Sequence, residues 1–459
     1  MFKKFVLGAI LAGFSLFLIS CSSSGGAGQT DTPTEPPPVS TPTTETSGIK
    51  LTADGSGDYP DLATAITAAE AGETILLEAG TYRLDETLEI NKSISLIGSG
   101  MDETIILSSA AKAVLLFSGE GAFALEGITV QHEGDAPAQV VLVENGEIDF
   151  SNCRFTGSSG AFDNPNAGLM IRGHTTGTVE KCQVDNNVTA GIFLAGESNV
   201  VLDGNTCENN RGVGITFREN AGGEARNNNC TGNDFAGFFL ESSGKLLLEE
   251  NQCSRNGTEG KFGGGIFVSG AAAPTLEGNT CNANSYTGIA YGGGAPVGLA
   301  INNECSWNGQ FGIYLEGEAA PTLEKNTCNQ NGTGDKGAGI AYFDNTSGAA
   351  KENTVKENKS EGIFVGEEAT PDLIENICSM NVNHGINYLG TKGGTAEKNQ
   401  CGYNGQAGIL VDMNSMPLLK ENSCFNNRAG IYIVASANPE LVDNELNGNS
   451  VDNLIDLRP

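Results

Sequence analysis

The chain has 459 residues, of which 25 are Lys or Arg and 56 are Asp or Glu, so the formal net charge is −31. This balance argues against a nucleic-acid partner, because neutralising phosphates requires clustered basic residues. Hydrophobic residues make up 39% of the chain and charged residues 18%, so the chain can bury a core and is not a solvated acidic tail.

The N-terminus has the pattern of a secretory signal. A basic start at Lys3 and Lys4 precedes an apolar stretch over 5–19 that is too short to span a bilayer comfortably. The stretch ends in Leu18-Ile19-Ser20-Cys21, which resembles the lipobox of bacterial lipoproteins. The resemblance implies a lipoprotein signal peptide over 1–20 and a lipid on Cys21, in the outer membrane if the cell is Gram-negative. An uncleaved N-terminal anchor is the alternative.

A low-complexity segment follows the signal. Residues 21–48 are rich in Ser, Thr, Pro, Gly and Glu and cannot bury enough apolar area to fold, which predicts a lipidated, disordered tether. The folded part is therefore expected over 49–459, with irregular coils to about residue 167 and regular 23-residue coils from about residue 168.

One repeat organises most of the chain. The motif Asn-x-Cys-x-x-Asn recurs mostly every 23 or 24 residues, and Val355 and Leu446 fill the Cys position in two further copies. A Gly-(Ile/Phe)-x-apolar segment follows each copy. The unit is too short for a strand and a helix, and it contains several short alternating apolar runs, so each unit predicts one coil of three short strands. The motif cysteines are Cys207, Cys230, Cys253, Cys281, Cys305, Cys328, Cys378, Cys401 and Cys424.

Stacked coils of this kind form an all-β parallel solenoid, because a single coil cannot bury its own apolar face. The coil-to-coil rise of about 4.8 Å predicts a rod on the order of 70 Å long. The leading Asn of each motif is expected to adopt the left-handed backbone of a sharp turn and to bond the equivalent amide one rung away.

Residues 49–459 resemble the right-handed parallel β-helix of the pectin-lyase-like superfamily. The segments 53–62, Gly80-Thr81-Tyr82 and 96–100, and later Asn152-Cys153-Arg154-Phe155, are similar to pectin methylesterases. The resemblance implies a single-stranded right-handed parallel β-helix. The residues at 62, 65, 66 and 69 form an apolar helical face and predict an N-terminal capping helix.

The resemblance ends where the esterase chemistry would begin. The Gln-Asp pair of the family should follow Phe155 closely, but this chain has Gly157-Ser158-Ser159-Gly160, and the nucleophile segment of the family is missing. The fold is therefore implied and the esterase activity is not, so whether the protein is an enzyme stays open.

The repeated cysteines have two interpretations. Eleven of the 12 cysteines remain after lipidation of Cys21, and in an exported chain they could form disulfides or bind metal. The replacements Val355 and Leu446 favour small apolar fillers of the core. Stacked Cβ atoms about 4.8 Å apart also exceed the usual disulfide separation of about 3.8 Å, which predicts mostly free, buried thiols.

A column of aromatic residues is the main candidate binding surface. The residue between the two inward positions of the Gly-Ile-x-apolar strand points outward by alternation, so we expect it to be exposed and able to stack on sugar rings. Cross-strand stabilisation of an exposed sheet is the alternative. The candidate carbohydrate-binding residues are Phe193, Phe239, Phe267, Tyr314, Phe364 and Tyr432.

Longer turns precede the same strand at 157–167, 256–264 and 331–338. Insertions in solenoids gather on the binding face, so they favour this side of the rod, although chance clustering is an alternative.

Ionisable residues align just past the aromatic column. Carboxylates one or two rungs apart would have the roughly 5 to 10 Å separations that glycosidases use. The alternative is that polar turn residues align by chance in a chain with many acids. The candidate catalytic residues are Arg172, His174, Glu197, Arg218, Glu219 and Glu241.

The charge bears on the ligand. Loss of Lys3 and Lys4 with the signal peptide takes the net charge from −31 to −33. A polyanion would be repelled unless Ca²⁺ bridges it, so a neutral polysaccharide or a cationic or Ca²⁺-loaded surface is expected, and no cofactor other than a possible Ca²⁺. Contact with a membrane is expected only through Cys21, and the oligomeric state is left open.

Three functions remain open. The first is a lipid-anchored protein of the cell envelope that binds carbohydrate on its aromatic face. The second is a polysaccharide hydrolase or lyase that uses acidic residues on that face. The third is a structural or maturation protein of the envelope without a sugar ligand.

Overall fold

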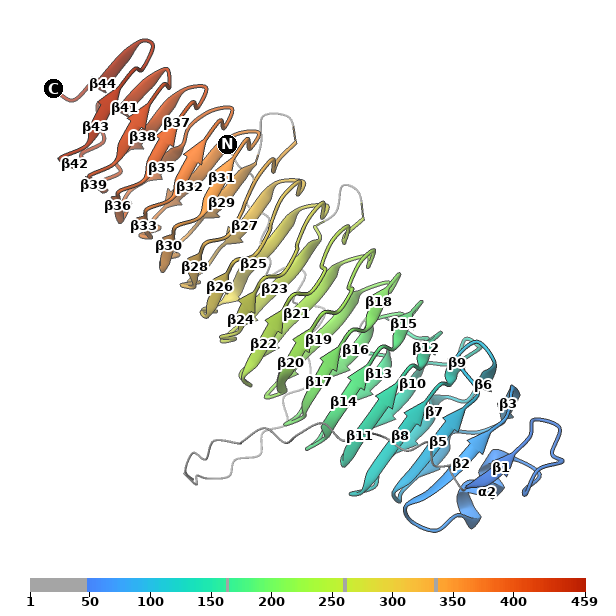
Figure 1. Ribbon diagram of the computed structural model, residues 1–459. Coiled ribbons are helices and arrows are strands. Elements are labelled where there is room, and N and C mark those ends of the chain that lie inside the picture. The colour runs from blue at the N-terminus through green and yellow to red at the C-terminus, as the bar shows by residue number, and fades with distance from the viewer. Residues whose placement is uncertain (1–47, 162–164, 259–261, 334–336) are drawn as a thin grey trace, which may run out of the picture.

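The computed structural model describes residues 48–161, 165–258, 262–333 and 337–459. The expected signal peptide, the lipidation site Cys21 and the tether up to residue 47 lie outside these residues. The described chain forms a rod of stacked coils, each of which adds strands to the long faces of the rod (Figure 1). The strands pair in parallel with the equivalent strand of the next coil, as the repeat predicts.

Sheet A, the first long face, has 17 strands. Apolar residues at every second position of its longer strands face the interior of the rod. Its strands are β1 (Ile49–Leu51), β2 (Glu73–Leu77), β5 (Ile94–Gly98), β8 (Ala122–Glu126), β11 (Glu147–Ser151), β14 (Thr176–Glu180), β17 (Asn199–Asp203), β20 (Gly222–Arg226), β22 (Leu246–Glu249), β24 (Thr275–Glu277), β26 (Leu299–Ile301), β28 (Thr322–Glu324), β30 (Ala349–Lys351), β33 (Asp372–Ile374), β36 (Thr395–Glu397), β39 (Leu418–Lys420) and β42 (Glu440–Val442).

Sheet B, the narrow second face, consists of a 6-stranded part and a 5-stranded part. Between the two parts the coils continue the face through single bridges, from Asn229 to Thr327. Its strands are β3 (Gly80–Leu84), β6 (Thr104–Ser108), β9 (Thr129–His132), β12 (Arg154–Thr156), β15 (Gln183–Asp185), β18 (Thr206–Glu208), β31 (Thr354–Lys356), β34 (Ile377–Ser379), β37 (Gln400–Gly402), β40 (Ser423–Phe425) and β43 (Glu445–Asn447).

Sheet C has 16 strands and contains the Gly-Ile-x-apolar segments. Its strands are β4 (Leu88–Ile90), β7 (Lys112–Phe117), β10 (Ala138–Val143), β13 (Ala167–Ile171), β16 (Ala190–Leu194), β19 (Val213–Glu219), β21 (Ala236–Ser242), β23 (Gly264–Gly270), β25 (Thr287–Gly294), β27 (Phe311–Leu315), β29 (Ala338–Tyr342), β32 (Glu361–Glu367), β35 (Ile386–Gly390), β38 (Ala407–Met413), β41 (Ala429–Ile433) and β44 (Asp452–Asp456).

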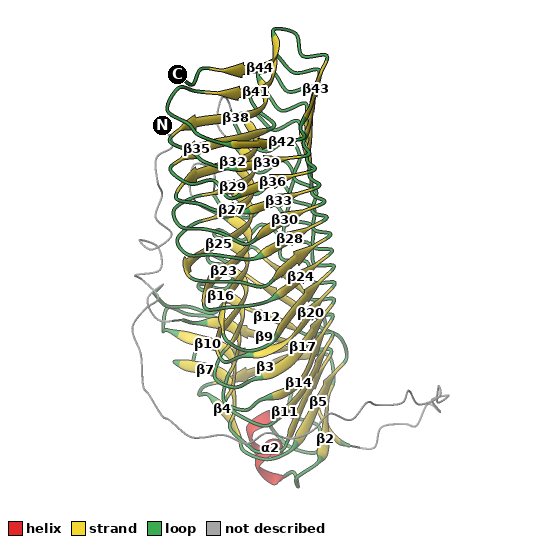
Figure 2. Ribbon diagram, turned by 90° about the vertical axis from the view of Figure 1, so that its left-hand side faces the viewer, coloured by secondary structure: helices red, strands yellow, loops and turns green. Residues whose placement is uncertain are grey.

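Helix α2 (Leu62–Ala68) lies at the N-terminal end of the stack (Figure 2). The Asp61 side chain caps the helix by accepting a hydrogen bond from the Thr64 N–H at 2.7 Å. Leu62, Ala65 and Ile66 are buried. The helix therefore presents the apolar face that the sequence predicts to the first coil.

The interior holds the cysteine column. Every described cysteine is free and buried, and consecutive residues such as Cys378, Cys401 and Cys424 pair in register. Burial raises the pKa of the Cys230 and Cys305 thiols, so both stay protonated. The prediction of free, buried thiols is confirmed.

Two asparagine ladders flank the cysteine column. In one, Asn303 Nδ2 donates to Asn326 Oδ1 at 3.0 Å, and Asn326 Nδ2 donates to Asn353 Oδ1 at 3.0 Å. The second Asn of the motif forms an equivalent ladder, as from Asn308 to Asn331 at 3.1 Å. The predicted ladder is therefore present, and a second one accompanies it.

The expected left-handed backbone lies one residue away from the predicted position. It falls on the residue before each ladder Asn, such as Asn302 (φ 56°) and Lys325 (φ 53°), and not on Asn303 or Asn326. The ladder Asn must direct its amide into the coil, so the sharp turn is completed just before it.

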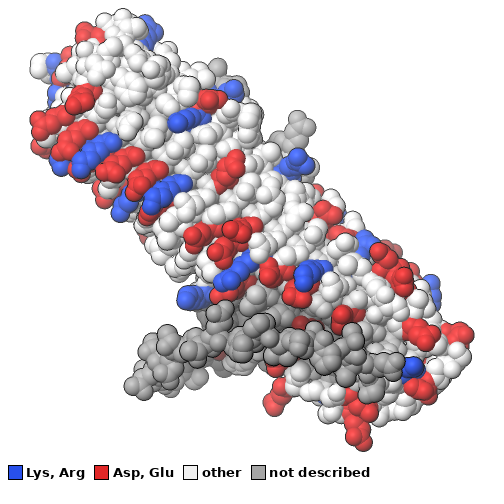
Figure 3. All heavy atoms as spheres, viewed as in Figure 1, with Lys and Arg blue, Asp and Glu red and all other residues white. Residues whose placement is uncertain are grey.

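Charged residues coat the outside of the rod. Figure 3 shows Asp and Glu spread over the visible face with Lys and Arg among them. Some of these charges pair between rungs, as Lys420 does with Glu397 at 2.9 Å. Such exposed pairs contribute little to stability.

Candidate functional site

The aromatic column on sheet C is buried and not exposed as expected. Phe193, Phe239, Phe267, Tyr314 and Phe364 are each at most 8% exposed, and Phe267 is 0% exposed; Tyr432 alone is half-buried. Alternation does turn these side chains away from the interior of the rod. From Phe239 to Phe364 the prediction of exposure was wrong because neighbouring aromatic residues fold over the column from outside.

Phe239, Phe267, Tyr314 and Phe364 belong to a second apolar cluster, which we call the outer cluster. Its buried members lie on the outside of sheet C from β19 to β32. Its buried members are Val213, Ala236, Phe239, Phe267, Ala290, Phe311, Tyr314, Ala338, Ala341 and Phe364, and its half-buried members are Phe235, Phe262, Tyr286, Phe343 and Leu389. Phe193 belongs to a separate, smaller cluster with Leu142 and Met170.

The rings of the outer cluster contact one another along the rod. Phe267 stacks on both Phe235 and Phe262, with ring centroids 5.0 and 5.2 Å apart. Tyr286 continues the series, 4.5 Å from Phe262 and 6.1 Å from Tyr314. The series ends where the Phe343 ring lies 5.4 Å from Tyr314 and 5.1 Å from Phe364.

Four half-buried rings, Phe235, Phe262, Tyr286 and Phe343, cover the buried column and face solvent in part. The sequence interpretation missed all four. A signal was available for three of them, because an aromatic residue directly precedes the start of β21 and β25 and Phe262 lies two residues before β23, whereas Phe343 directly follows β29. The sequence interpretation followed the alternation within the strands and did not include the residues next to the strand ends.

Two of the three longer turns lead into strands of the outer cluster, β23 and β29, and the third leads into β13. Phe262 is the first described residue after the gap at 259–261, and its ring packs on Phe267. The central residues of the three turns, 162–164, 259–261 and 334–336, lie outside the described residues. That these turns contribute to binding remains a prediction.

Acidic side chains border the outer cluster. The Tyr314 hydroxyl donates to Glu316 Oε2 at 2.8 Å, and burial raises the pKa of Tyr314 far above its usual range. Asp344 Oδ2 accepts from the Gly317 N–H at 3.0 Å, and Glu367 Oε2 accepts from the Asp344 N–H at 3.0 Å. At this edge of sheet C, carboxylates thus accept hydrogen bonds from backbone N–H groups of the preceding rung.

A polar group lies at the C-terminal flank of the outer cluster. Glu361, the first residue of β32, is 5% exposed, and Asn387 of β35 is 7% exposed. Asn387 Nδ2 donates to Glu361 Oε1 at 3.3 Å. His384, two residues before β35, is half-buried, and its Nδ1 accepts from the Ala407 N–H at 3.1 Å.

Five of the six candidate catalytic residues take part in ion pairs between neighbouring rungs. Arg172 pairs with Glu144 at 2.6 Å, and Arg218 pairs with Glu241. His174 and Glu197 lie 3.3 Å apart with side chains 77% and 64% exposed.

Glu219 Oε2 accepts from the Gly196 N–H at 2.7 Å. The carboxylates of Glu197, Glu219 and Glu241 thus have different partners, and a catalytic role for any of them remains a prediction.

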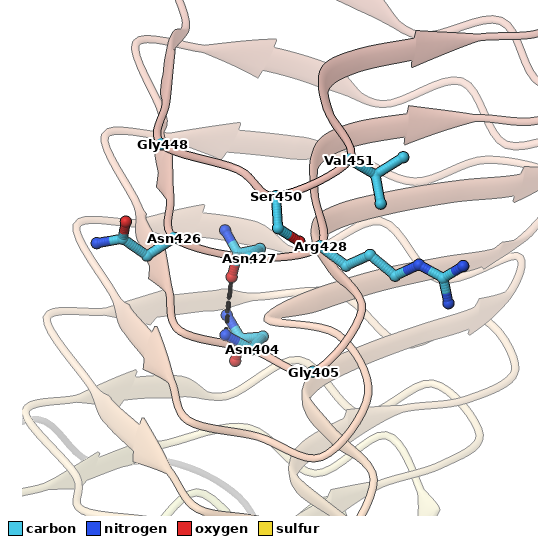
Figure 4. Close-up of a pocket in the computed structure, with 8 residues that line it drawn as sticks. All are labelled: Asn404, Gly405, Asn426, Asn427, Arg428, Gly448, Ser450 and Val451. Carbon is cyan, nitrogen blue, oxygen red and sulfur yellow. Dashed lines mark hydrogen bonds between the residues drawn. The ribbon is translucent and has the colours of Figure 1, made fainter.

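A shallow pocket of about 460 Å³ lies near the C-terminal end, lined by residues including Asn404, Asn427, Arg428 and Ser450. The Asn404 and Asn427 amides are engaged in the second ladder, at 3.0 Å. Figure 4 shows the Arg428 side chain extending away from that pair. The pocket therefore offers few polar groups that converge on a ligand.

Among the described residues, no group of three or more His, Cys, Asp or Glu side chains is arranged to hold a metal ion. In the same part of the chain, no helix is both long and apolar enough to cross a membrane.

Comparison with known proteins identifies the architecture. The family model described as right handed beta helix region matches residues 138–301, 259–394 and 336–456. None of the curated protein sequences compared with the chain matches it.

Among solved structures, one match is the catalytic unit of the GH87 alpha-1,3-glucanase from Streptomyces thermodiastaticus. It has 13% identity and a TM-score of 0.39, over 85% of this chain and 66% of that chain, just under two thirds. The periplasmic alginate epimerase AlgG matches with 13% identity and a TM-score of 0.37, over 81% and 76% of the two chains. The pectate lyase Pel9A matches with 14% identity and a TM-score of 0.36, over 70% and 78%.

Proposed function

The chain belongs to the right-handed β-helix family, and we propose that it is a glycan-binding protein whose binding surface is the outer cluster of sheet C. The observation that carries this proposal is the line of half-buried rings, Phe235, Phe262, Tyr286 and Phe343, above a fully buried aromatic layer. Rings held by packing lose little side-chain freedom when a flat ligand stacks on them.

The length of the surface favours a polymer. The outer cluster reaches from β19 to β32, and the part with ring contacts spans the strands from β21 to β32. These six rungs are separated by five steps of about 4.8 Å, or roughly 24 Å, the length of several sugar residues. A single monosaccharide would cover only one or two of the rings.

Charge limits the glycan class. The chain carries −31 overall, and Glu316, Asp344 and Glu367 lie along the edge of the outer cluster. Polyuronates would be repelled in the absence of a bridging divalent cation. A neutral or cationic glycan is therefore the proposed ligand, with Ca²⁺ as a possible bridge to an anionic one.

The test is a glycan-binding measurement on the whole protein. Neutral and acidic oligosaccharides should be compared by calorimetry with and without Ca²⁺. Phe343→Ala and Tyr286→Ala should each weaken binding about tenfold, the equivalent of about 1.4 kcal/mol. Tyr403→Ala, which removes an exposed ring far from the outer cluster, is the matched control and should leave binding unchanged.

A structural role is the second candidate, and a specific observation favours it. The strand aromatics are almost fully buried, so their packing alone could explain why they recur. If no glycan of any class binds, this alternative replaces the first. Catalysis is the third candidate, and single replacement of Glu197, Glu219 and Glu241 with unchanged turnover of an identified glycan would exclude it.

We also propose that the protein is anchored in the cell envelope through a lipid on Cys21. The support is the lipobox-like sequence alone. Mass spectrometry of the mature N-terminus should find the lipid, and Cys21→Ser should move the protein from the membrane fraction to the soluble fraction. An unmodified mature N-terminus would refute this proposal.

A further inference from the structure

Three polar residues interrupt the outer face of sheet C within two rungs. Between Val213 and Ala429, Glu361 and His384 occupy a column that is otherwise apolar or small, and Asn387 interrupts the aromatic column beside it. Over these coils the other members of the first column are Val213, Ala236, Gly264, Thr287, Phe311, Ala338, Ala407 and Ala429, and in the last coil the column ends in Asp452. A departure from a repeat that continues on both sides indicates a local requirement that packing does not impose.

Glu361 and Asn387 are buried with hydrogen-bonding capacity left over. Asn387 Nδ2 reaches Glu361 Oε1, but Glu361 Oε2 and Asn387 Oδ1 are both buried without a hydrogen-bond partner. Both unpartnered atoms are acceptors, so the group that completes this site must donate hydrogen bonds. Leaving two such atoms unpaired is costly, so a donor group that reaches them would be stabilised.

No described side chain supplies a positive charge here. Within the described residues, no ion pair includes Glu361. His384 is in the adjacent rung, but its Nδ1 accepts a hydrogen bond and burial lowers its pKa to about 4, so the ring is neutral at neutral pH. A buried carboxylate without a cation is destabilising until a cationic donor binds.

Aromatic rings of the outer cluster adjoin the same site. Phe364 pairs in register with Asn387, and its ring contacts Phe343 with centroids 5.1 Å apart. Aromatic faces attract cations as well as stacking on sugar rings. The site therefore combines acceptor oxygens, a negative charge and aromatic faces within two rungs.

We propose that Glu361 and Asn387 bind the protonated amino group of an amino sugar in a glycan that lies along the outer cluster. This inference rests on the proposed glycan-binding function. An ammonium group supplies three donors and a positive charge in one compact unit, which matches the two unpartnered oxygens and the carboxylate. A lysine side chain or a polyamine shares this chemistry but would not use the row of rings.

Calorimetry on the whole protein at pH 6 and low ionic strength tests this proposal. The probes are a glucosamine hexamer, the N-acetylglucosamine hexamer of the same length, cellohexaose and spermidine. The glucosamine hexamer should bind at least tenfold more tightly than its N-acetylated counterpart, because acetylation removes the charge and two donors. Spermidine should bind much more weakly than the glucosamine hexamer.

Glu361→Gln keeps the shape of the side chain and removes its charge. It should reduce the preference for the glucosamine hexamer to less than twofold while binding of cellohexaose is retained. Glu375→Gln, at an exposed turn of sheet A, is the matched control and should keep the full preference. If Glu361→Gln does not fold, Asn387→Ala provides the same test of the preference for the glucosamine hexamer. The rise in melting temperature of the unaltered protein with each hexamer then compares the two hexamers independently.

The outcomes separate the two proposals. If no hexamer binds, the proposed function fails and this inference fails with it. If hexamers bind equally with and without acetyl groups, or if Glu361→Gln keeps the preference, the two oxygens hold only water and this inference alone is overturned. Spermidine binding as tight as that of the glucosamine hexamer would show ammonium recognition without a sugar and would also overturn it.

Discussion

The inner and outer faces of sheet C are built from the same strands but follow different rules. Inside, each strand repeats the same solution, an apolar row in which residues such as Ile289, Ile313 and Ile340 pair in register. Outside, the residues vary from Phe267 to Ala290 to Asn387 along one column. An inner residue is confined by identical neighbours above and below, whereas an outer residue is free to change. Departures from the repeat therefore carry functional information mainly on the outer face.

Breaking an inner ladder should have the largest effect. Asn326→Ala removes four side-chain hydrogen bonds, two donated to Ala300 and Asn353 and two accepted from Asn303, in a fully buried position. We expect the free energy of unfolding to fall by about 4 kcal/mol. Urea denaturation followed by circular dichroism measures it. Asn345→Ala, at an exposed turn, is the control; equal effects from both variants would contradict a structural role for the ladder.

Removing a ring of the outer cluster should have the next largest effect. Phe267→Ala leaves a cavity between Phe235 and Phe262, and we expect a loss of about 3 kcal/mol of stability. Tyr432→Ala, in the same column but half-buried, should cost clearly less. The same denaturation experiment compares the two. A Phe267→Ala variant as stable as the unaltered protein would mean that the outer cluster does not contribute to the fold.

The polar flank of the outer cluster should make stability depend on pH. Burial lowers the pKa of His384 to about 4, while the nearby Asp412 raises it. Because the unfolded state, with a pKa of about 6.5 for histidine, then takes up the proton more readily, stability is lost as the pH falls from about 6.5 to 4. Between pH 7 and pH 5 this loss amounts to about 2 kcal/mol.

His384→Gln isolates that contribution. Asp and Glu residues titrate in both proteins, so the difference between their denaturation midpoints at pH 7 and pH 5 reports His384 alone. We expect the variant to lose about 2 kcal/mol less than the unaltered protein over this interval. The same pH dependence in both proteins would show that His384 is accessible to protons in the folded state.

Replacing a thiol of the inner column should have the smallest effect. Cys328→Val copies the natural residue of the next coil, Val355, which pairs in register with Cys378. We expect less than about 1 kcal/mol of change, because a small apolar filler replaces another. Thermal unfolding with and without a reducing agent measures it. A large loss, or a strong effect of the reductant on the unaltered protein, would indicate that the thiols do more than fill space.

The interior was predictable residue by residue. The recurrence of Asn and Cys at 23 or 24 residues predicted the coils, the free thiols and the ladder through Asn205 and its successors. The equal role of the second Asn was visible in the motif but was not inferred. The position of the left-handed residue was wrong by one, because the sequence does not show on which side of the Asn the chain turns.

The candidate site was only partly predictable. The sequence correctly placed the strand aromatics from Phe193 to Tyr432 on the outside of sheet C, but it could not show that Phe235, Phe262, Tyr286 and Phe343 cover many of them. The sequence also did not single out Glu361 and Asn387. The search for repeats identifies residues that recur in every coil, and these two differ from the residues at the same positions of the neighbouring coils.

By itself, therefore, the sequence determined the β-helix and its interior, because a repeat stacked on copies of itself has the same neighbours in every coil. Only the tertiary structure decided what lies on the outer face of sheet C. Aromatic residues next to the strand ends of one coil pack over the strand of a neighbouring coil. The burial of a side chain such as Phe267 therefore depends on contacts with these residues and not on alternation along the strand.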